Sequence, residues 1–227
     1  EINRFNYTGT EQGELPKLSA PQSEALDSIH RMFIDKNVTL LHGVTSSGKT
    51  EIYIHLIDYI LKKGSQALYL VPEIALTTQL TRRLQKVFVK RVIIYHSKFS
   101  DNERVDIWKR MLHDPSPCVV IGARSSLFLP FSRLGLVIVD EEHESSYKQF
   151  DPAPRYNARD CAIVLASMHG AKTLLGSATP AIETYYKALN GRYGLVTLSE
   201  RYEGVQLPLI EIVDLNDERR RGRISGP

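Results

Sequence analysis

Residues 38–50, VTLLHGVTSSGKT, are the strongest indication of the fold of this chain. Residues 38–42 are mostly apolar or β-branched, which is typical of a buried strand, and residues 49–62 have the pattern of a helix. Between them, residues 43–50 match G-x-x-x-x-G-K-[ST], the phosphate-binding P-loop. A strand, a glycine loop and a helix in this order direct backbone N–H groups at one point, which favours a polyphosphate anion.

The P-loop supplies the predicted nucleotide contacts. We expect the Lys49 ammonium to reach the β- and γ-phosphates of ATP, and the Thr50 hydroxyl to bind Mg²⁺. The predicted cofactor-binding residues of the loop are Gly43, Thr45, Ser46, Ser47, Gly48, Lys49 and Thr50. With a strand and a helix on either side, a chance match in an ordinary glycine turn is the poorer explanation.

A second element narrows the chemistry. Residues 136–139 form an apolar run, typical of a parallel strand buried on both faces, and the run ends in Asp140-Glu141-Glu142-His143, here called the acidic box. Parallel α/β sheets bind ligands at this end of their strands. We expect Asp140 to hold Mg²⁺ through water and Glu141 to orient or deprotonate the attacking water, so Lys49, Asp140 and Glu141 are the predicted catalytic residues. Acidic residues also favour a first helical turn, but their place after a P-loop in one alternating pattern argues against that alternative.

The P-loop, the D-E-x-H box and the sequence GSATP at residues 176–180 together resemble the superfamily-2 DEXH helicases and translocases. Further stretches resemble the PriA-type primosomal replication-restart helicases of bacteria, and the resemblance runs from about Leu18 to the end of the chain. These stretches are VPEIAL at 71–76, IGARSSL at 121–127, DEEHESSYKQ at 140–149 and RYNARD at 155–160. One departure is Ser46, where glycine is expected.

The resemblance implies a RecA-like P-loop lobe, an α/β fold whose mostly parallel sheet carries helices on both faces. It implies that this lobe binds ATP and Mg²⁺ within a longer parent protein, an ATP-dependent DNA helicase that moves 3′→5′, unwinds stalled forks and restarts replication through primosome assembly. Implied partners are single-stranded and forked DNA, primosome proteins and single-strand-binding proteins, in the bacterial cytoplasm at the nucleoid. Zn²⁺ is implied only beyond Pro227. A second lobe would supply arginine fingers, worth roughly 10³–10⁵ in rate, so we expect the isolated lobe to be nearly inactive.

One more nucleotide contact is expected at the start of the first helix. In LSAPQ, residues 18–22, Gln22 resembles the adenine-contacting glutamine of these helicases. A side-chain amide can donate to and accept from the edge of adenine, and so can select ATP over GTP. An ordinary glutamine at a helix start explains the residue equally well.

Aromatic and basic side chains alternate directly after the acidic box. Aromatic faces stack on unpaired bases, and cations hold phosphates, so this segment is a predicted DNA contact. Its residues are Tyr147, Lys148, Phe150, Arg155 and Tyr156. The resemblance implies that the loop links DNA occupancy to the ATP site. A surface loop whose tyrosines pack on the domain is the alternative.

Three further segments follow predicted strands. Arg124 comes just past strand 118–121, and residues 72–77 hold the equivalent place after strand 67–71. Backbone N–H groups, a hydroxyl and a guanidinium there could grip a DNA phosphate, and the resemblance assigns both segments to the single-strand track. The hydroxyls of Ser177 and Thr179 can bond the acidic box and relay its position. A plain strand-end turn is the alternative.

Strand-like and helix-like runs alternate along the chain, which predicts a parallel sheet between helices. The expected strands are 38–42, 67–71, 92–95, 118–121, 136–139 and 172–175, with two more at 195–198 and 209–213; the expected helices start at Ser23 and continue at 49–62, 75–88, 101–112, 157–168 and 181–189. We assign residues 1–17 to a linker from an upstream domain, 18–200 to the lobe, and 201–227 to an extension toward a zinc region and a second lobe. The basic end, residues 219–223, is interpreted as solvated linker because no aromatic residue interrupts it.

Composition sets outer bounds on function. An apolar content of 42% and a charged content of 24% are those of an ordinary globular protein, and a net charge of +3 alone does not argue for nucleic acid. Cys118 and Cys161 are interpreted as buried thiols in a reducing compartment, and no cysteine or histidine spacing predicts a zinc site. The longest apolar runs have the length of strands, so no membrane span is expected.

Other function classes stay open at this point. A P-loop kinase would need an acceptor pocket and an arginine-rich lid, and the long gap to Asp140 and the Ser-Ala-Thr sequence argue against it. A non-catalytic nucleotide-binding module and another superfamily-2 DNA translocase are the remaining alternatives. Stimulation of hydrolysis by single-stranded DNA in the parent protein would separate an enzyme that moves on DNA from the first two.

Overall fold

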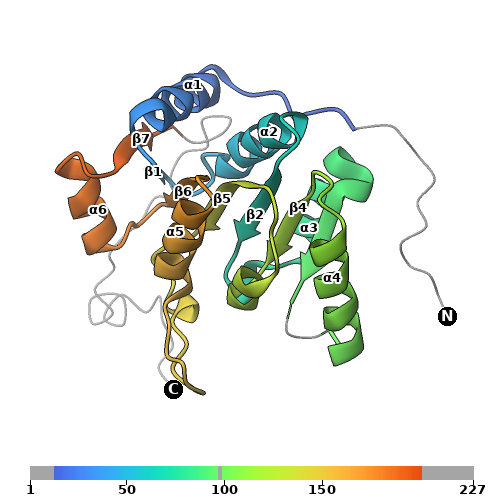
Figure 1. Ribbon diagram of the computed structural model, residues 1–227. Helices are drawn as coiled ribbons and strands as arrows, with labels where there is room; N and C mark the ends of the chain where they lie inside the picture. The colour runs from blue at the N-terminus through green and yellow to red at the C-terminus, as the bar shows by residue number, and fades with distance from the viewer. Residues whose placement is uncertain (1–12, 97–98, 201–227) are drawn as a thin grey trace, which may run out of the picture.

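The computed structural model describes residues 13–96 and 99–200. Its helices and strands alternate along the chain, as expected (Figure 1). The helices are α1 (Ala20–Asp35), α2 (Lys49–Lys62), α3 (Thr78–Phe88), α4 (Asp101–His113), α5 (Ala158–Met168) and α6 (Ile182–Leu189). The strands are β1 (Val38–Gly43), β2 (Gln66–Leu70), β3 (Val92–Tyr95), β4 (Val119–Gly122), β5 (Leu134–Asp140), β6 (Lys172–Ser177) and β7 (Gly194–Leu198).

The seven strands form one sheet in the order β3-β4-β2-β5-β6-β1-β7. Every neighbouring pair is parallel, so all carboxyl ends of the strands meet at one edge of the sheet. The register pairs Asp140 of β5 with Gly176 of β6, and His42 of β1 with Ser177 of β6. The P-loop, the acidic box and residues 176–180 therefore leave the sheet from three adjacent strands, β1, β5 and β6.

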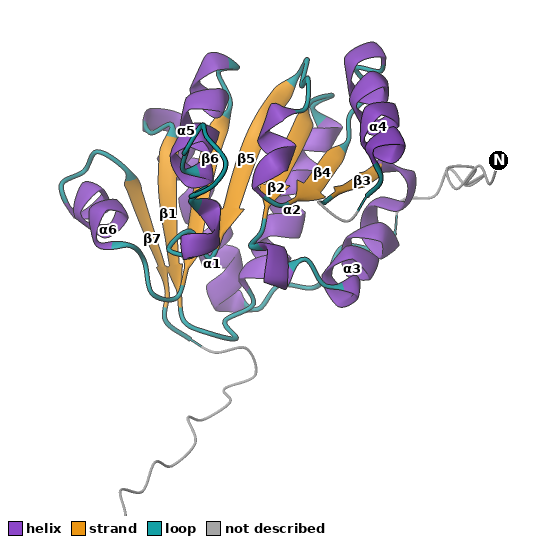
Figure 2. Ribbon diagram, turned by 90° about the horizontal axis from the view of Figure 1, so that it is seen from below, coloured by secondary structure: helices purple, strands orange, loops and turns teal. Residues whose placement is uncertain are grey.

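Helices cover both faces of the sheet, which confirms the predicted α/β architecture (Figures 1 and 2). Side chains from α1, α2 and α3 pack on one face, and side chains from α4, α5 and α6 pack on the other. Strand residues alternate between the two cores: in β2, Leu68 and Leu70 join one, and Ala67 and Tyr69 join the other. Apolar residues on both faces explain why the strands read as unbroken apolar runs.

The predicted elements agree with the structure at most positions and differ at the start of two helices. The helix expected from Ser23 begins at Ala20, because the Ser19 hydroxyl accepts a hydrogen bond from the Gln22 N–H and caps it. The helix expected at 75–88 begins at Thr78, because Thr77 is extended and its hydroxyl accepts a hydrogen bond from the Leu80 N–H, which caps the helix. The preceding residues, Glu73–Ala75, form a separate short 3₁₀ turn. The strand expected at 209–213, the basic end and most of the proposed N-terminal linker lie outside the described residues, so the domain boundaries stay predictions.

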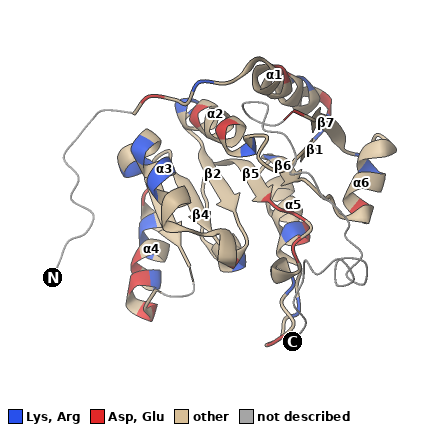
Figure 3. Cartoon of the chain, turned by 180° about the vertical axis from the view of Figure 1, so that it is seen from behind, with Lys and Arg blue, Asp and Glu red and all other residues tan. Residues whose placement is uncertain are grey.

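The distribution of charged residues and the burial of the two cysteines are typical of an α/β domain with helices on both faces of its sheet. Lys, Arg, Asp and Glu lie on helices and connecting segments, while the strands are almost free of charge (Figure 3). Cys118 is buried and its burial raises the pKa of the thiol to about 11, whereas Cys161 is only partly buried. None of the described helices has the length and apolar character needed to cross a membrane.

Candidate functional site

The P-loop joins β1 to α2 and has the backbone conformation of a phosphate cradle. Gly48 is left-handed, with φ of 79°, and stands at the N-cap of α2, so the first N–H groups of the helix are open. A Cβ at this position would lie 2.1 Å from the Nε2 atom of Gln22, so only glycine fits. The Lys49 ammonium donates to the Gly43 carbonyl at 3.0 Å. Ser46 also has a positive φ, 63°, the conformation for which glycine was expected.

Gln22 lies beneath the P-loop and is buried, with 1% of its surface exposed. Its Nε2 donates to the carbonyls of Ser47 and Gly48 at 3.1 and 3.3 Å, and its Oε1 accepts from the Ser19 N–H at 2.8 Å. The two bonds of Nε2 hold the start of α1 against the loop, and the bond of Oε1 caps α1 itself. Contact with adenine would require the amide to give up some of them, so the adenine role of Gln22 stays a prediction.

A cavity of about 360 Å³ opens above the P-loop, lined by residues 46–51, Arg83, Asp140 and Glu141. The Oγ of Ser47 is buried there without a hydrogen-bond partner among the described residues. Arg83 of α3 forms an ion pair with Glu51 at the rim. An unsatisfied hydroxyl, an ammonium and the open N-terminus of α2 are the donors that a polyphosphate needs, so the residues present fit a nucleotide.

Asp140, at the end of β5, is held by two buried tyrosines. The Tyr53 hydroxyl donates to Oδ1 at 3.0 Å and the Tyr69 hydroxyl donates to Oδ2 at 3.1 Å. The Glu141 N–H also donates to Oδ1, at 3.1 Å. Burial, and then the charge of Glu141, raise the pKa of Asp140, while Lys49 and the two hydroxyls oppose that rise. The carboxylate is thus kept in a fixed orientation, as its predicted role in holding Mg²⁺ requires.

Glu141 is the more exposed carboxylate, with its side chain 36% accessible. Its Oε1 lies 3.7 Å from the Lys49 ammonium, and its Oε2 lies 3.7 Å from Nδ1 of His143. The backbone of Glu141 has a φ of 44°, which L-residues rarely adopt, so the local structure holds this side chain toward the cavity at a conformational cost. The predicted catalytic residues Lys49, Asp140 and Glu141 therefore come together.

Glu142 turns away from the cavity and is 2% exposed. Its Oε1 accepts from the Ala181 N–H at 2.7 Å, and its Oε2 accepts from the Thr184 hydroxyl at 2.9 Å and the Arg159 guanidinium at 3.0 Å. Arg159 also pairs with Asp160 at 3.0 Å. Glu142 therefore ties the acidic box to the start of α5 through the partly buried Arg159, and to the start of α6 through Ala181 and Thr184.

His143 connects the acidic box to residues 176–180. Its Nδ1 lies 2.8 Å from the Ser177 hydroxyl, and its Nε2 lies 3.3 Å from the Thr179 hydroxyl. The Thr179 N–H donates to the Ser177 hydroxyl at 3.0 Å. The expected bond between these hydroxyls and the acidic box is therefore present through His143, and the relay function assigned to them stays a prediction.

Tyr147 does not provide a stacking face, and that part of the sequence interpretation is wrong. Its side chain is 1% exposed, and its hydroxyl donates to the carbonyl of Asp140 at 2.6 Å and to that of Leu70 at 3.2 Å. A tyrosine hydroxyl that is buried needs such partners, and here the strand ends supply them. Tyr147 instead ties the aromatic segment to the end of β5.

Arg124 and Lys148 brace the same segment. The Arg124 guanidinium donates to the Lys148 carbonyl at 3.2 Å and to the Ser146 carbonyl at 3.4 Å. The Lys148 ammonium donates to the Arg155 carbonyl at 2.9 Å, and Lys148 pairs with Asn157 in an isolated antiparallel bridge. The structure thus joins the stretch after β4 to the stem of the loop, and contacts of either cation with DNA phosphate stay predictions.

The tip of the loop projects into solvent. Residues 150–155 are all exposed, and Phe150 is 67% exposed. Tyr156 is half-buried and its ring meets that of Phe128 edge to face, with centroids 5.3 Å apart. Phe150, Arg155, Phe128 and Tyr156 therefore offer accessible aromatic and basic groups near the acidic box, as a single-strand contact requires.

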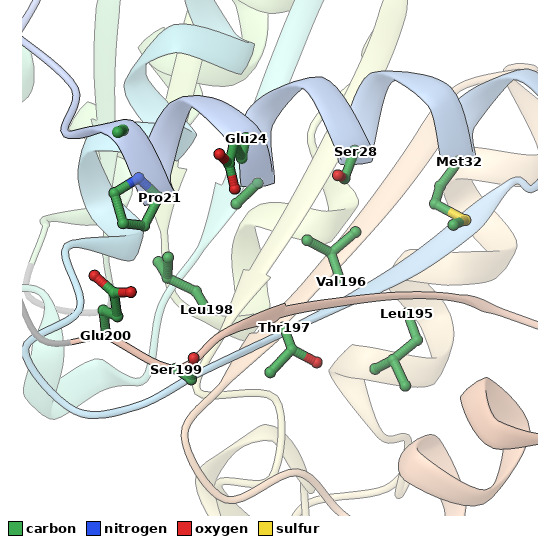
Figure 4. Close-up of a pocket in the computed structure, with 12 residues that line it drawn as sticks. Pro21, Glu24, Ser28, Met32, Leu195, Val196, Thr197, Leu198, Ser199 and Glu200 are labelled. Atoms are coloured by element: carbon green, nitrogen blue, oxygen red, sulfur yellow. The ribbon is translucent and has the colours of Figure 1, made fainter.

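A second cavity, of about 430 Å³, runs between α1 and β7 (Figure 4). Figure 4 shows its walls formed by Pro21, Glu24, Ser28 and Met32 of α1 and by residues 195–200. The charged side chains that line it, Glu24 and Glu200, are both acidic. Such a lining does not suit a phosphate, so the larger cavity is not the candidate nucleotide site.

Sequence reasoning missed the tyrosines on Asp140, the partners of Glu142 and the rim arginine, Arg83. Tyr53 and Tyr69 stand in otherwise apolar runs, and a buried phenol requires a hydrogen-bond partner, which was the available signal. Arg159 sits among alanines of α5 that join the core, and a guanidinium that is partly buried there likewise requires a carboxylate. In both cases, periodicity could not identify the partner.

The comparisons with known proteins agree with this geometry. The sequence pattern of the DEAD/DEAH box helicases matches residues 19–188. The chain is 45% identical over 206 residues to the replication restart protein PriA of Bacillus subtilis, covering 90% of this chain and 25% of that protein. It is 49% identical over 205 residues to PriA of Rickettsia felis, covering 90% of this chain and 31% of that protein. The chain therefore spans about a quarter to a third of the length of these relatives.

Solved structures give the same fold. RecG bound to a three-way DNA junction matches with a TM-score of 0.60 and 26% identity, over 84% of this chain and 25% of that one. The Mycobacterium smegmatis helicase Lhr, bound to single-stranded DNA and AMP-PNP, matches with a TM-score of 0.56 and 22% identity, over 81% and 26% of the two chains. At the latter identity, the likeness shows the fold alone.

Proposed function

This chain belongs to the DEAD/DEAH box helicase family, and on that premise we propose that residues 18–200 are the ATP-binding lobe of a bacterial DNA helicase that restarts replication. The observation that carries the proposal is the meeting of Lys49, Asp140 and Glu141 from β1, β5 and their following segments around one cavity. The names of the relatives support the finer part, because the similar proteins from Bacillus subtilis and Rickettsia felis are replication restart proteins.

In the proposed nucleotide site, the N–H groups of the P-loop and the Lys49 ammonium bind the phosphates, and Lys49 exchanges its bond to the Gly43 carbonyl for a phosphate oxygen. Thr50 and Asp140 hold Mg²⁺, which when bound neutralises charge on the phosphates. Glu141 orients the attacking water or accepts its proton. The proximity of Lys49 to Glu141, 3.7 Å, supports these paired roles.

In the proposed DNA contact, the loop tip, residues 150–155, binds single-stranded DNA. It signals to the acidic box through the two segments that flank the tip, here called the stems, residues 147–149 and 156–159. Tyr147 in the first stem bonds the Asp140 carbonyl, and Arg159 in the second stem bonds Glu142. A base stacked on Phe150 or Tyr156 would shift groups that bond the backbone of Asp140 and the side chain of Glu142, on either side of Glu141. RecG, a neighbour in fold at 26% identity, was solved with a three-way DNA junction, which supports a DNA role for this lobe.

The remaining parts of the proposal concern the whole parent protein. They are 3′→5′ movement, unwinding of stalled forks, partnership with primosome and single-strand-binding proteins, action in the bacterial cytoplasm at the nucleoid, and zinc in a region outside this chain. Residues 1–17 and 201–227 would then be connections to other domains. The support is the likeness to PriA over 90% of this chain.

Titration calorimetry tests the nucleotide site directly. We expect Mg²⁺-dependent binding of ADP or ATP by this chain and strong loss of affinity in Lys49→Ala. Lys63→Ala, at the other end of the same helix, is a matched control and should bind like wild type. Equal affinity for wild type and Lys49→Ala would contradict the assignment.

Turnover tests the division of the active site. Glu141→Gln in the parent protein should retain ATP binding and lose hydrolysis, because the carboxylate that handles the water is gone. This chain alone should hydrolyse ATP barely above background, since it would lack an arginine finger from a second lobe. Robust steady-state turnover by the purified chain would show that the site is complete without a partner lobe.

A further inference from the structure

Two tyrosines that lie outside the recognised motifs touch the central carboxylate of the site. We propose that Tyr53 and Tyr69 are positioning residues that hold Asp140 in the orientation in which it binds Mg²⁺ with nucleotide. The inference rests on the proposed function, because it assigns a purpose to these hydroxyls only if Asp140 binds the metal. The two tyrosines would not contact the metal themselves; they would act on it through the Asp140 carboxylate.

The two hydroxyls approach the carboxylate from different elements. Tyr53 stands one helical turn after Lys49 in α2, and Tyr69 stands in β2, the neighbour of β5. Each donates to a different oxygen of Asp140, at 3.0 and 3.1 Å. Both side chains are 0% exposed, and their rings meet edge to face with centroids 5.5 Å apart. Neither hydroxyl can exchange its bond for one to bulk water, so the arrangement is fixed.

The hydroxyls limit how Asp140 can accept further hydrogen bonds. A carboxylate offers about four acceptor sites, two on each oxygen. On Oδ1, the Tyr53 hydroxyl and the Glu141 N–H are both bound, and on Oδ2 the Tyr69 hydroxyl is bound. The acceptor site that remains is therefore on Oδ2, and Asp140 lines the cavity above the P-loop. Orienting partners of this kind behind a metal ligand typically change metal affinity 10- to 100-fold.

Gly176 is a second observation that supports the role of the Tyr53 hydroxyl, because only a glycine leaves room for it. A Cβ at residue 176 would lie 1.8 Å from the Tyr53 hydroxyl oxygen and 3.5 Å from Oδ1 of Asp140. Any side chain there would displace the hydroxyl from the carboxylate. Gly176 of β6, the first residue of GSAT, thus leaves the space in which Tyr53 of α2 can donate its hydrogen bond to Asp140 of β5.

The experiment measures nucleotide binding by this chain as a function of Mg²⁺ concentration, with a fluorescent ADP analogue. Tyr53→Phe and Tyr69→Phe remove one hydroxyl each and keep the ring. We expect each to raise the half-saturating Mg²⁺ concentration about 10-fold or more, while affinity measured in EDTA stays at the wild-type value. Tyr95→Phe is the matched control: its hydroxyl is bonded to Arg104 at the far edge of the sheet, so both quantities should be unchanged.

Gly176→Ala tests the same contact from the other side, because it displaces the Tyr53 hydroxyl without deleting it. It should also raise the half-saturating Mg²⁺ concentration. If Tyr53→Phe does not fold, Gly176→Ala and Tyr69→Phe together test the inference.

Wild-type Mg²⁺ dependence in folded Phe variants would overturn the inference, and so would an equal loss of affinity in EDTA, which would indicate general damage to the site. Absence of Mg²⁺-dependent binding in wild type would instead overturn the proposed function.

Discussion

The acidic box and the loop that follows it, residues 148–157, are neighbours in the chain and opposites in environment. Asp140 is half-buried and Glu142 is buried, and each receives at least two hydrogen bonds from side chains of other elements. Residues 150–155 of the loop are all exposed, and the loop is attached to the domain by its stems. Hydrogen bonds from other elements therefore fix Asp140 and Glu142 of the box, whereas the predicted DNA contact is free to adapt to its ligand.

The box and the loop therefore predict different responses to substitution. A change in the box should alter the free energy of unfolding, because buried polar groups lose partners. A change at the loop tip should leave that free energy nearly unchanged and act on DNA binding alone. Four substitutions test this contrast, ordered by their expected effect on stability.

Arg159→Met should have the largest effect. It leaves the Glu142 carboxylate, 2% exposed, without its cationic partner, and removing one member of a buried pair costs about 3–5 kcal/mol. Urea unfolding measures the loss. The double variant Glu142→Gln/Arg159→Met should recover part of it, because the uncompensated charge is gone. An Arg159→Met protein as stable as wild type would mean that the box is not held by this pair.

Tyr147→Phe should have an intermediate effect. It removes the hydroxyl that donates to the carbonyls of Asp140 and Leu70, and a buried acceptor left without its donor costs about 1–3 kcal/mol. The measurement is again urea unfolding. Tyr186 is exposed, so Tyr186→Phe is the control, and its free energy of unfolding should lie within about 0.5 kcal/mol of wild type. If both variants unfold alike, the hydroxyl of Tyr147 is not a structural tie.

Ser46→Gly extends the comparison to the P-loop and should stabilise the protein slightly. Ser46 has a φ of 63°, which glycine adopts without strain, and the relief, offset by the greater freedom of glycine in the unfolded chain, should amount to about 0.5–1 kcal/mol. Thermal unfolding without nucleotide measures it. Gly48→Ala is the opposite case, because its Cβ would meet Gln22, and it must destabilise.

Phe150→Ala should have the smallest effect on stability, within about 0.5 kcal/mol, because the ring is 67% exposed. In the parent protein it should cost about 1–3 kcal/mol of single-strand affinity, the value of one stacking contact. Tyr156→Ala and Lys148→Ala should likewise blunt DNA-stimulated hydrolysis and leave nucleotide affinity nearly unchanged. Titration of ATPase rate with single-stranded DNA checks all three. Wild-type stimulation with the same half-saturation would make the loop an ordinary surface segment.

The sequence predicted the elements better than their contacts. The helix at 49–62 and the strand at 92–95 have the predicted bounds, because apolar periodicity and the P-loop mark them directly. Tyr147 was predicted to stack on a base, and it instead bonds the carbonyls of Asp140 and Leu70. Gln22 bonds the carbonyls of Ser47 and Gly48, which the sequence did not indicate, and its contact with adenine stays a prediction. Local pattern identifies residues capable of a hydrogen bond, but the order of strands in the sheet decides which partner is nearest. The order β2-β5-β6-β1 brings Tyr69 and Gly176 to Asp140, and no periodicity along the chain encodes that order.

The place of β1 in the sheet has a consequence for the newly made chain. Both hydrogen-bonded neighbours of β1 are C-terminal to it: β6 pairs Thr173 with Val38, and β7 pairs Gly194 with Thr39. During synthesis at about 5–20 residues per second, the strand that leads into the P-loop must wait on the order of ten seconds for its first partner. We expect the edges of this strand to be open to chaperones and proteases during that interval. A ribosome-bound chain that stops short of β6 should therefore be readily degraded.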